Sequence, residues 1–131
     1  MKILVVDDSR AMRAYTRGVL RENFECQIVE ATSGFEALRL LPRQSFDLVI
    51  TDINMPDING LELIRFIRKS ERHKELPILI ISTQTSEQNR SRVYDLGANA
   101  FISKPFEPET LKKEVSRLTE PGVSTRISGE Q

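Results

Sequence analysis

The sequence predicts an α/β domain built on a parallel β-sheet. Short apolar runs recur along the 131 residues, most of them continuous rather than alternating with polar residues, at positions 3–6, 28–31, 48–50, 78–81 and 100–102. Continuous apolar runs are typical of strands that are covered on both faces, as in parallel sheets. Each run is followed by a stretch with the apolar spacing of a helix. Five βα units therefore follow one another along the chain.

Each predicted helix has its own apolar positions, and several have a recognisable boundary. These positions are Met12, Tyr15 and Val19; Ala37, Leu38 and Leu41; Leu61, Ile64 and Ile67; Val93 and Leu96; and Leu111, Val115 and Leu118. We expect Pro42 to end the second helix, Gly97 to follow the fourth and Pro108 to lie in the first turn of the fifth. Five successive βα units favour a doubly wound, flavodoxin-like sheet with strand order 2-1-3-4-5.

The composition excludes several classes of protein. Lys plus Arg and Asp plus Glu number 19 each, so no net positive charge favours direct binding to nucleic acid or to an anionic membrane. The first apolar run is far too short for a signal peptide or a membrane span, and we expect a cytoplasmic protein. Cys26 is the only cysteine, which excludes an internal disulfide, a cysteine-based zinc site and a CxxC redox pair. We expect it to be a small buried residue entering a strand.

Two segments are expected to be exposed to solvent. The periodic pattern covers residues 1–119, the predicted domain, whereas residues 120–131 (EPGVSTRISGEQ) lack periodicity and predict a disordered tail or the start of a linker. The densely charged stretch 65–75 predicts a solvated helix end and loop, and we expect His73, the sole histidine, to be solvated there.

Polar residues follow four of the predicted strands. In chain order they are Asp7 and Asp8, Asp52 and Asn54, Ser82 and Thr83, and Lys104. Taken singly, Asp, Asn and Ser at such positions commonly cap a helix or form a turn. Parallel strands, however, all end at one edge of their sheet, and ligands of open α/β sheets bind at that edge. The sequence therefore places three carboxylates, a hydroxyl and an ammonium together.

This set of residues suits metal-assisted phosphoryl chemistry. Three crowded carboxylates repel one another, and a raised pKa or a bound cation relieves the repulsion; oxygen ligands with room for water suit Mg²⁺. A carboxylate beside Mg²⁺ can attack a phosphorus centre and form an acyl phosphate. Asp52 is the expected nucleophile, since the third strand flanks the first and so places Asp7 and Asp8 beside it as metal ligands. Lys104 would neutralise the phosphoryl oxygens, and the Ser82 hydroxyl would sense them.

Four segments carry a family resemblance: LVVDDS, DLVITDINMPDINGLEL, PILIISTQ and GANAFISKPF. Over residues 2 to about 118 the chain resembles the response-regulator receiver domains of two-component systems, in particular the stand-alone chemotaxis type. The resemblance implies that Asp52 accepts a phosphoryl group from a histidine kinase or a small phosphodonor, and that the chain is not a turnover enzyme. It implies Mg²⁺ held by Asp8, Asp52 and the backbone carbonyl of Asn54, with Asp7 assisting through water. It also implies a cis bond between Lys104 and Pro105.

The same resemblance implies how the signal leaves the domain. In this family the hydroxyl residue at the Ser82 position moves towards the phosphoryl group, and the aromatic residue at the Phe101 position swings inward. The face formed by the fourth and fifth helices and the last strand then changes, and a target protein docks there. We expect a monomer or a weak phosphorylation-dependent dimer through this face, and otherwise ordinary solvated charges at Arg90, Arg92, Asp95 and Lys112.

Two residues depart from the family pattern, and two others lie where side chains set the lifetime of the phosphoryl group. Thr83 replaces the usual alanine or glycine and should tighten the mouth of the pocket. Phe101 lacks the hydroxyl that a tyrosine would offer. Asn54 and Gln84 lie where side chains tune the lifetime of the acyl phosphate, and neither can act as a general base at neutral pH. We expect a modest hydrolysis rate, tuned by Asn54, Thr83 and Gln84.

Three alternatives compete with this interpretation. A haloacid-dehalogenase-like phosphatase shares the chemistry, but it requires an acid two residues after the nucleophile, where this chain has Asn54, and its paired aspartates lie late in the chain. A pseudo-receiver would keep the fold and signal without phosphorylation; only Thr83 favours it. A dinucleotide-binding fold would require a glycine-rich first βα turn, where this chain has DDSRAM.

Overall fold

The fold is a five-stranded sheet with helices on both faces, seen in a computed structural model that describes residues 1–120. In chain order its elements are β1 (Lys2–Val6), α1 (Arg10–Asn23), β2 (Gln27–Ala31), α2 (Gly34–Leu40), the 3-10 helix η1 (Leu41–Arg43), β3 (Leu48–Thr51), α3 (Gly60–Lys69), β4 (Ile78–Ser82), α4 (Glu87–Leu96), β5 (Ala100–Ser103) and α5 (Pro108–Thr119). All five apolar runs lie in strands, as predicted. The expectation for the tail falls, apart from Glu120, outside the described residues.

The strands pair in parallel in the order β2-β1-β3-β4-β5, which confirms the predicted topology. In this register Val6 of β1 lies opposite Thr51 of β3, so that Asp7 and Asp52 leave neighbouring strands at the same level. Likewise Ser82 of β4 lies opposite Ser103 of β5, directly before Lys104. Strand register alone therefore brings four of the predicted site residues to one edge.

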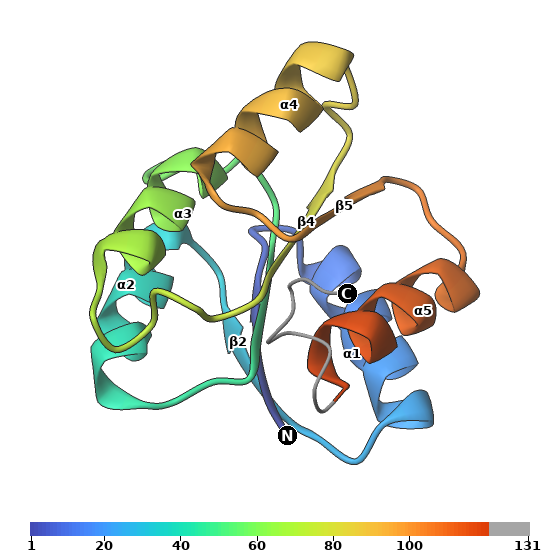
Figure 1. Cartoon of the computed structure of the whole chain (residues 1–131). Helices are drawn as coiled ribbons and strands as arrows, with labels where there is room; N and C mark the ends of the chain where they lie inside the picture. Colours follow the sequence, from blue (N-terminus) through green and yellow to red (C-terminus); the bar gives the residue numbers. More distant parts are fainter. Residues whose placement is uncertain (121–131) are drawn as a thin grey trace.

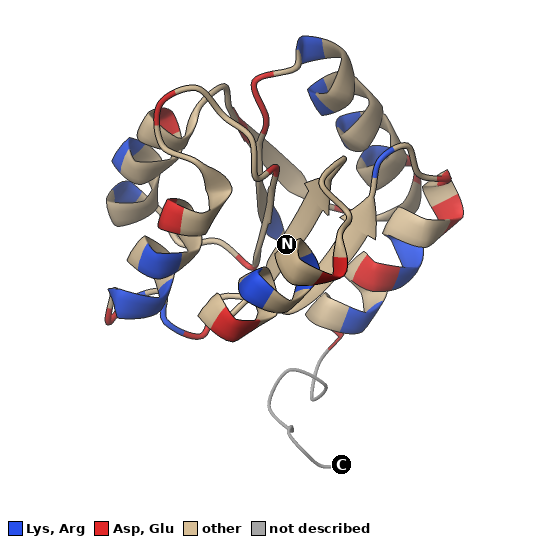
Figure 2. Cartoon of the chain, turned by 90° about the horizontal axis from the view of Figure 1, so that it is seen from above, with Lys and Arg blue, Asp and Glu red and all other residues tan. Residues whose placement is uncertain are grey.

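The sheet divides the core into two halves. Helices α1 and α5 cover one face, and α2, α3 and α4 cover the other (Figure 1). Because side chains alternate along a strand, Phe101 of β5 packs with the α2-α3-α4 half and its neighbour Ile102 packs with the α1-α5 half. Acidic and basic residues lie on helices on both sides of the sheet (Figure 2), in keeping with the balanced charge. Within residues 1–120 every helix is too short or too polar to span a lipid bilayer.

Helix boundaries follow the capping residues in the sequence. Ser9, Ser33 and Ser86 each accept a hydrogen bond from a backbone amide of the first turn, and Asn59 forms a capping box with Glu62. Helix α4 ends at Gly97, which has a left-handed backbone with φ of 119°, and α5 begins at Pro108. Pro42 lies in η1, two residues beyond the end of α2, so the predicted helix end is followed by one further tight turn.

The prediction that His73 is solvated is wrong. His73 is only 5% exposed, and its Nε2 lies 2.7 Å from the carbonyl oxygen of Leu41 in η1. The turn after α3 folds back on η1, whose buried carbonyl needs a donor, and the imidazole supplies it. Nearby Arg68 is half-buried and donates to the carbonyl oxygens of Leu76 and Gly97. The charged stretch thus contains two structural side chains, which composition alone could not reveal.

Cys26 is half-buried just before β2 and packs against the α1-α5 half of the core, so its predicted burial is only partial. Burial raises the pKa of the Cys26 thiol above its usual value, while the positive charges of the N-terminus and Arg21 oppose this rise. Cys26 is therefore a packing residue with little thiolate character.

An ion-pair network fixes α1 against β2. The Glu30 carboxylate of β2 accepts hydrogen bonds from Arg13 and Arg17 of α1, and Arg13 also donates to the backbone carbonyl of Asp7, at 2.7 Å. Partial burial acts to raise the pKa of Glu30, but the hydrogen bonds and charges of the two arginines outweigh it and lower the pKa below its ordinary value of 4.5. The network therefore stabilises the fold only while Glu30 is ionised.

This network predicts an acid-dependent stability. Since the folded-state pKa of Glu30 is depressed, its contribution is complete above pH 4.5 and is lost as the pH falls through the folded-state value. The free energy of unfolding of Glu30→Gln should therefore lie below that of the wild type at pH 7, and the two should converge in acid. Urea unfolding followed by circular dichroism between pH 7 and pH 3 measures both, with exposed Glu25→Gln as the control. A constant gap across this range would contradict the assignment.

Substitution of glycine by alanine should have opposite effects on stability at Gly60 and at Gly18. A Cβ at Gly60, the first residue of α3, would collide with the backbone carbonyl oxygen of Asp52, whereas a Cβ at Gly18 in α1 would meet no atom within 4 Å. Gly60→Ala should lower the free energy of unfolding by about 1–3 kcal/mol. Gly18→Ala should raise it by up to about 1 kcal/mol, because alanine is the better helix former. Urea unfolding of both variants measures the two changes, and equal effects would refute the close approach at Gly60.

Candidate functional site

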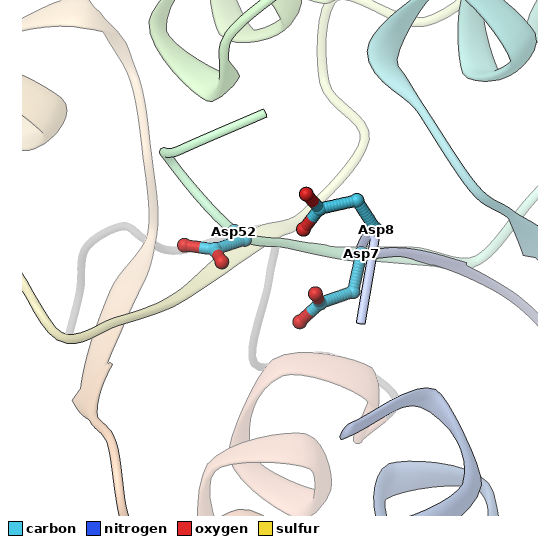
Figure 3. A group of neighbouring side chains, drawn as sticks. All are labelled: Asp7, Asp8 and Asp52. Atoms are coloured by element: carbon cyan, nitrogen blue, oxygen red, sulfur yellow. The ribbon is translucent and has the colours of Figure 1, made fainter. Parts of the chain in front are cut away.

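The predicted site residues meet at the carboxyl edge of the sheet. Asp7 and Asp8 directly follow β1, Asp52 follows β3, and Lys104 follows β5. Figure 3 shows the carboxylates of Asp7 and Asp8 leaving the end of β1 on the side of Asp52. Asp7 and Asp52 are buried, at 4% and 8% exposure, whereas Asp8 is exposed and opens the site to solvent.

Lys104 holds the two buried carboxylates. Its Nζ lies 2.9 Å from Oδ2 of Asp52 and 3.0 Å from Oδ2 of Asp7. Burial acts to lower the pKa of Lys104, but the hydrogen bond and charge of Asp52, and then those of Asp7, outweigh burial and raise the pKa above its ordinary value. The ammonium therefore stays charged and offsets part of the repulsion between the acids. The peptide bond that follows it, to Pro105, is cis, as the family resemblance implied.

The backbone fixes the orientation of Asp52. Its Oδ1 accepts hydrogen bonds from the amides of Ile53, at 2.7 Å, and Asn54, at 3.3 Å, and its Oδ2 faces Lys104. The loop that supplies these amides is held by a bond from the Gly60 amide to the Ile53 carbonyl, at 2.8 Å. Asp7 is fixed in the same way, since its Oδ1 accepts from the amide of Ser9 at 2.9 Å. Backbone amides thus fix the orientation of both carboxylates.

The three acids fit a divalent cation. One carboxylate oxygen from each of Asp7, Asp8 and Asp52 lies within 4.8 Å of the other two. Three hard oxygen ligands at this separation could contact one ion, and the exposure of Asp8 leaves room for water ligands. The side chain of Asn54 is exposed, while its backbone adjoins the acids. The acidic triad could therefore bind a divalent metal.

Ser82 ends β4, the strand between β3 and β5, and Thr83 and Gln84 follow it. Ser82 is fully buried, its Oγ accepts a hydrogen bond from the Gln84 amide at 2.9 Å, and its carbonyl accepts from the Lys104 amide at the same distance. Thr83 is exposed and Gln84 half-buried. The structure thus brings Ser82 to the strand end that carries Lys104.

One residue near the site, Arg90, makes contacts that we did not expect from the sequence. The guanidinium of Arg90 in α4 stacks over the Phe101 ring, 4.6 Å from its centroid, and donates to Oγ of Ser103 at 2.9 Å. We expected Arg90 to be an ordinary solvated charge, which is wrong. It lies three residues before the buried Val93 and therefore on the same face of the helix, and this spacing could have revealed its inward position.

The comparisons with known proteins agree with this geometry. The response regulator receiver domain family matches residues 3–116. The chemotaxis protein CheY-3 of Vibrio cholerae is 38% identical over 92% of either chain, and the chemotaxis protein CheY of Pseudomonas aeruginosa is 35% identical over 92% of this chain and 97% of its own. The solved structure of Vibrio cholerae CheY4 has a TM-score of 0.83 at 35% identity and covers 89% of this chain and 97% of its own.

These matches decide between the alternatives for the fold and its chemistry. They span nearly all of the described residues, including the acidic triad and Lys104, and they exclude the phosphatase and dinucleotide-binding interpretations. The chain belongs to the response regulator receiver family, and it is a phosphoacceptor signalling protein rather than a turnover enzyme.

Proposed function

We propose that Asp52 is the phosphoacceptor and that Mg²⁺ assists the transfer. The observation that carries this proposal is the position of Asp52: it is buried, oriented by two backbone amides, and lies 2.9 Å from Lys104 beside two further carboxylates. Asp7 and Asp8 flank it from the neighbouring strand. Membership of the family implies a histidine kinase as donor and a partner downstream.

The proposed transfer is a substitution at phosphorus. An oxygen of the Asp52 carboxylate forms a bond to the phosphorus atom, while the bond between phosphorus and the donor breaks and the donor keeps its electron pair. The donor is the imidazole nitrogen of a phosphorylated histidine in the kinase, or the acetate oxygen of acetyl phosphate. Asp8, Asp52 and the carbonyl of Asn54 would hold Mg²⁺, with Asp7 acting through water, and the ion supplies positive charge to the transferring oxygens.

Lys104 and Ser82 would act after the transfer. The Lys104 ammonium, already at the Asp52 carboxylate, would pair with a phosphoryl oxygen. In the structure the Ser82 Oγ acts as an acceptor for the Gln84 amide, so its own hydrogen is available to a phosphoryl oxygen. Movement of Ser82 would shift the population of the domain towards an arrangement with a changed α4-β5-α5 face, to which Phe101 contributes. The target protein would bind this face.

We also propose the oligomeric state of the domain, the compartment in which it acts and its rate of acyl-phosphate hydrolysis. Residues 1–119 would act as one signalling unit, monomeric or weakly dimeric when phosphorylated, without contact to nucleic acid. Since kinases draw the phosphoryl group from ATP, we place the unit in the cytoplasm. Asn54 lies two residues after Asp52, and Thr83 and Gln84 directly follow Ser82. None of the three can act as a general base, and we propose that they set a modest rate of hydrolysis.

The phosphoacceptor assignment predicts a single modification. The purified chain incubated with acetyl phosphate should gain one phosphoryl group, detected as intact mass, and the gain should require Mg²⁺. Asp52→Asn should abolish it, because the amide cannot form an acyl phosphate, whereas exposed Asp95→Asn in α4 should not. No gain by the folded wild type under any condition would favour the pseudo-receiver, which signals as an unmodified docking module.

The proposed role of Ser82 predicts that a mutation can remove the response of α4 without removing phosphoryl uptake. Ser82→Ala should still be phosphorylated, because Asp52 and the metal ligands are intact, but it should lose about half or more of the phosphorylation-dependent shifts of α4 amides in nitrogen-15 NMR spectra. Exposed Ser91→Ala in α4 is the control and should keep the full response. An unchanged α4 response in Ser82→Ala would overturn the coupling through Ser82.

A further inference from the structure

We propose that Arg90 is a positioning residue that couples α4 to the end of β5 that carries Lys104. This inference rests on the proposed function, because Arg90 would be the residue through which phosphorylation of Asp52 changes the position of α4. Arg90 contacts two residues of β5: its guanidinium covers the Phe101 ring and donates to the Ser103 hydroxyl. Ser103 directly precedes Lys104, whose ammonium contacts Asp52. Two side-chain contacts and one peptide bond thus connect α4 with the pocket.

Helix α4 has few other attachments of this kind. Val93 is its one fully buried residue, and most of the sequence EQNRSRVYDL is polar. The helix lies at the outer edge of the molecule, beside α3 (Figure 1). Burial of apolar surface is the main force that fixes a surface helix, so a helix with one buried side chain is held weakly by packing. The contacts of Arg90 with β5 therefore add to the packing of Val93 and of partly buried Leu96 in fixing α4.

The two ends of α4 are held differently. At its C-terminal end Arg68 of α3 donates to the carbonyl oxygen of Gly97, at 2.7 Å, and this anchor lies far from the pocket along the helix. Towards the N-terminal end Arg90 supplies the contacts with β5. A change at the carboxyl end of β5 can therefore move the first part of α4 while Arg68 retains the last.

On the β5 side, the strand end that Arg90 contacts is linked to Asp52, the proposed phosphoacceptor. Ser103 pairs with Ser82 across the sheet, and the amide of Lys104 donates to the carbonyl oxygen of Ser82 at 2.9 Å. The ammonium of Lys104 contacts Asp52 at 2.9 Å, and a phosphoryl group on Asp52 would occupy that space. Displacement of Lys104 or Ser82 would be passed to Ser103 and so to Arg90. By thermodynamic reciprocity, an arrangement of α4 that favours one position of Lys104 also favours one state of Asp52.

The cation and the donor groups of Arg90 are both needed for this role. A guanidinium over an aromatic face is attracted to it, and its planar fork can donate to a neighbour at the same time. Lysine would keep the charge but lose the fork, and methionine would keep only the apolar stem. Arg92, two residues on, is exposed and provides a matched control on the same helix.

The test compares four variants of the full chain by two measurements. Arg90→Met, Arg90→Lys, Ser103→Ala and Arg92→Met are treated with acetyl phosphate and Mg²⁺; intact mass reports phosphoryl uptake, and nitrogen-15 NMR reports the shifts of α4 amides on phosphorylation. We expect Arg90→Met to take up one phosphoryl group yet lose at least about half of the α4 shifts. Ser103→Ala should lose a smaller part, Arg90→Lys should recover part of the response, and Arg92→Met should match the wild type.

A double variant separates coupling from simple loosening of the fold. If Arg90 and Ser82 act along one route, adding Ser82→Ala to Arg90→Met should remove little further α4 response, whereas independent effects would add. Uptake with a full α4 response in Arg90→Met would overturn this inference alone. Absence of uptake by the wild type would overturn the proposed function and this inference with it. Should Arg90→Met fail to fold, Arg90→Lys and Ser103→Ala decide the question by the same measurements.

Discussion

The contact of Lys104 with Asp7 and Asp52 is the interaction on which the site depends. It joins the ends of three strands, since Asp7 follows β1, Asp52 follows β3 and Lys104 follows β5. Two buried carboxylates without this ammonium would repel each other in surroundings where water screens them poorly. The same contact keeps an oxygen of Asp52, the proposed nucleophile, next to a positive charge. One ion-pair group therefore serves both the stability of the sheet edge and the proposed transfer.

The surrounding fold fixes the positions of the groups that make this contact. The parallel register sets the level at which each strand ends, and the backbone amides of Ser9, Ile53 and Asn54 orient the carboxylates. Gly60 allows α3 to begin against the backbone of Asp52, where any larger residue would collide. All of these constraints come from the folded chain itself. The energetic cost of arranging the site is met when the domain folds, so little reorganisation would be left for the proposed transfer.

Much of this architecture could be predicted from the sequence, because its determinants are local or periodic. Continuous apolar runs located the strands, and the rule that parallel strands end at one edge brought Asp7, Asp8, Asp52 and Lys104 together. The positions of His73 and Arg90 were not predicted, because a carbonyl of η1 and a ring on β5 determine them. Charge density at 65–75 is a property of composition, whereas the burial of one histidine there depends on how two distant turns meet. The roles of Ser82 and Phe101 remain predictions, since they concern a change between states.

The division of the core by the sheet has a consequence for how such a domain can diverge. Phe101 and Val93 belong to the half beneath α2, α3 and α4, while Leu111, Val115 and Leu118 of α5 pack with α1 in the other half. Phe101 and α4 therefore share one hydrophobic compartment, whereas α5, the third element of the proposed docking face, is packed in the other. Substitutions inside the α1-α5 compartment can therefore alter the position of α5 on that face as well as the stability of the fold. Selection for thermal stability in that compartment and selection for a new partner are thus coupled through α5.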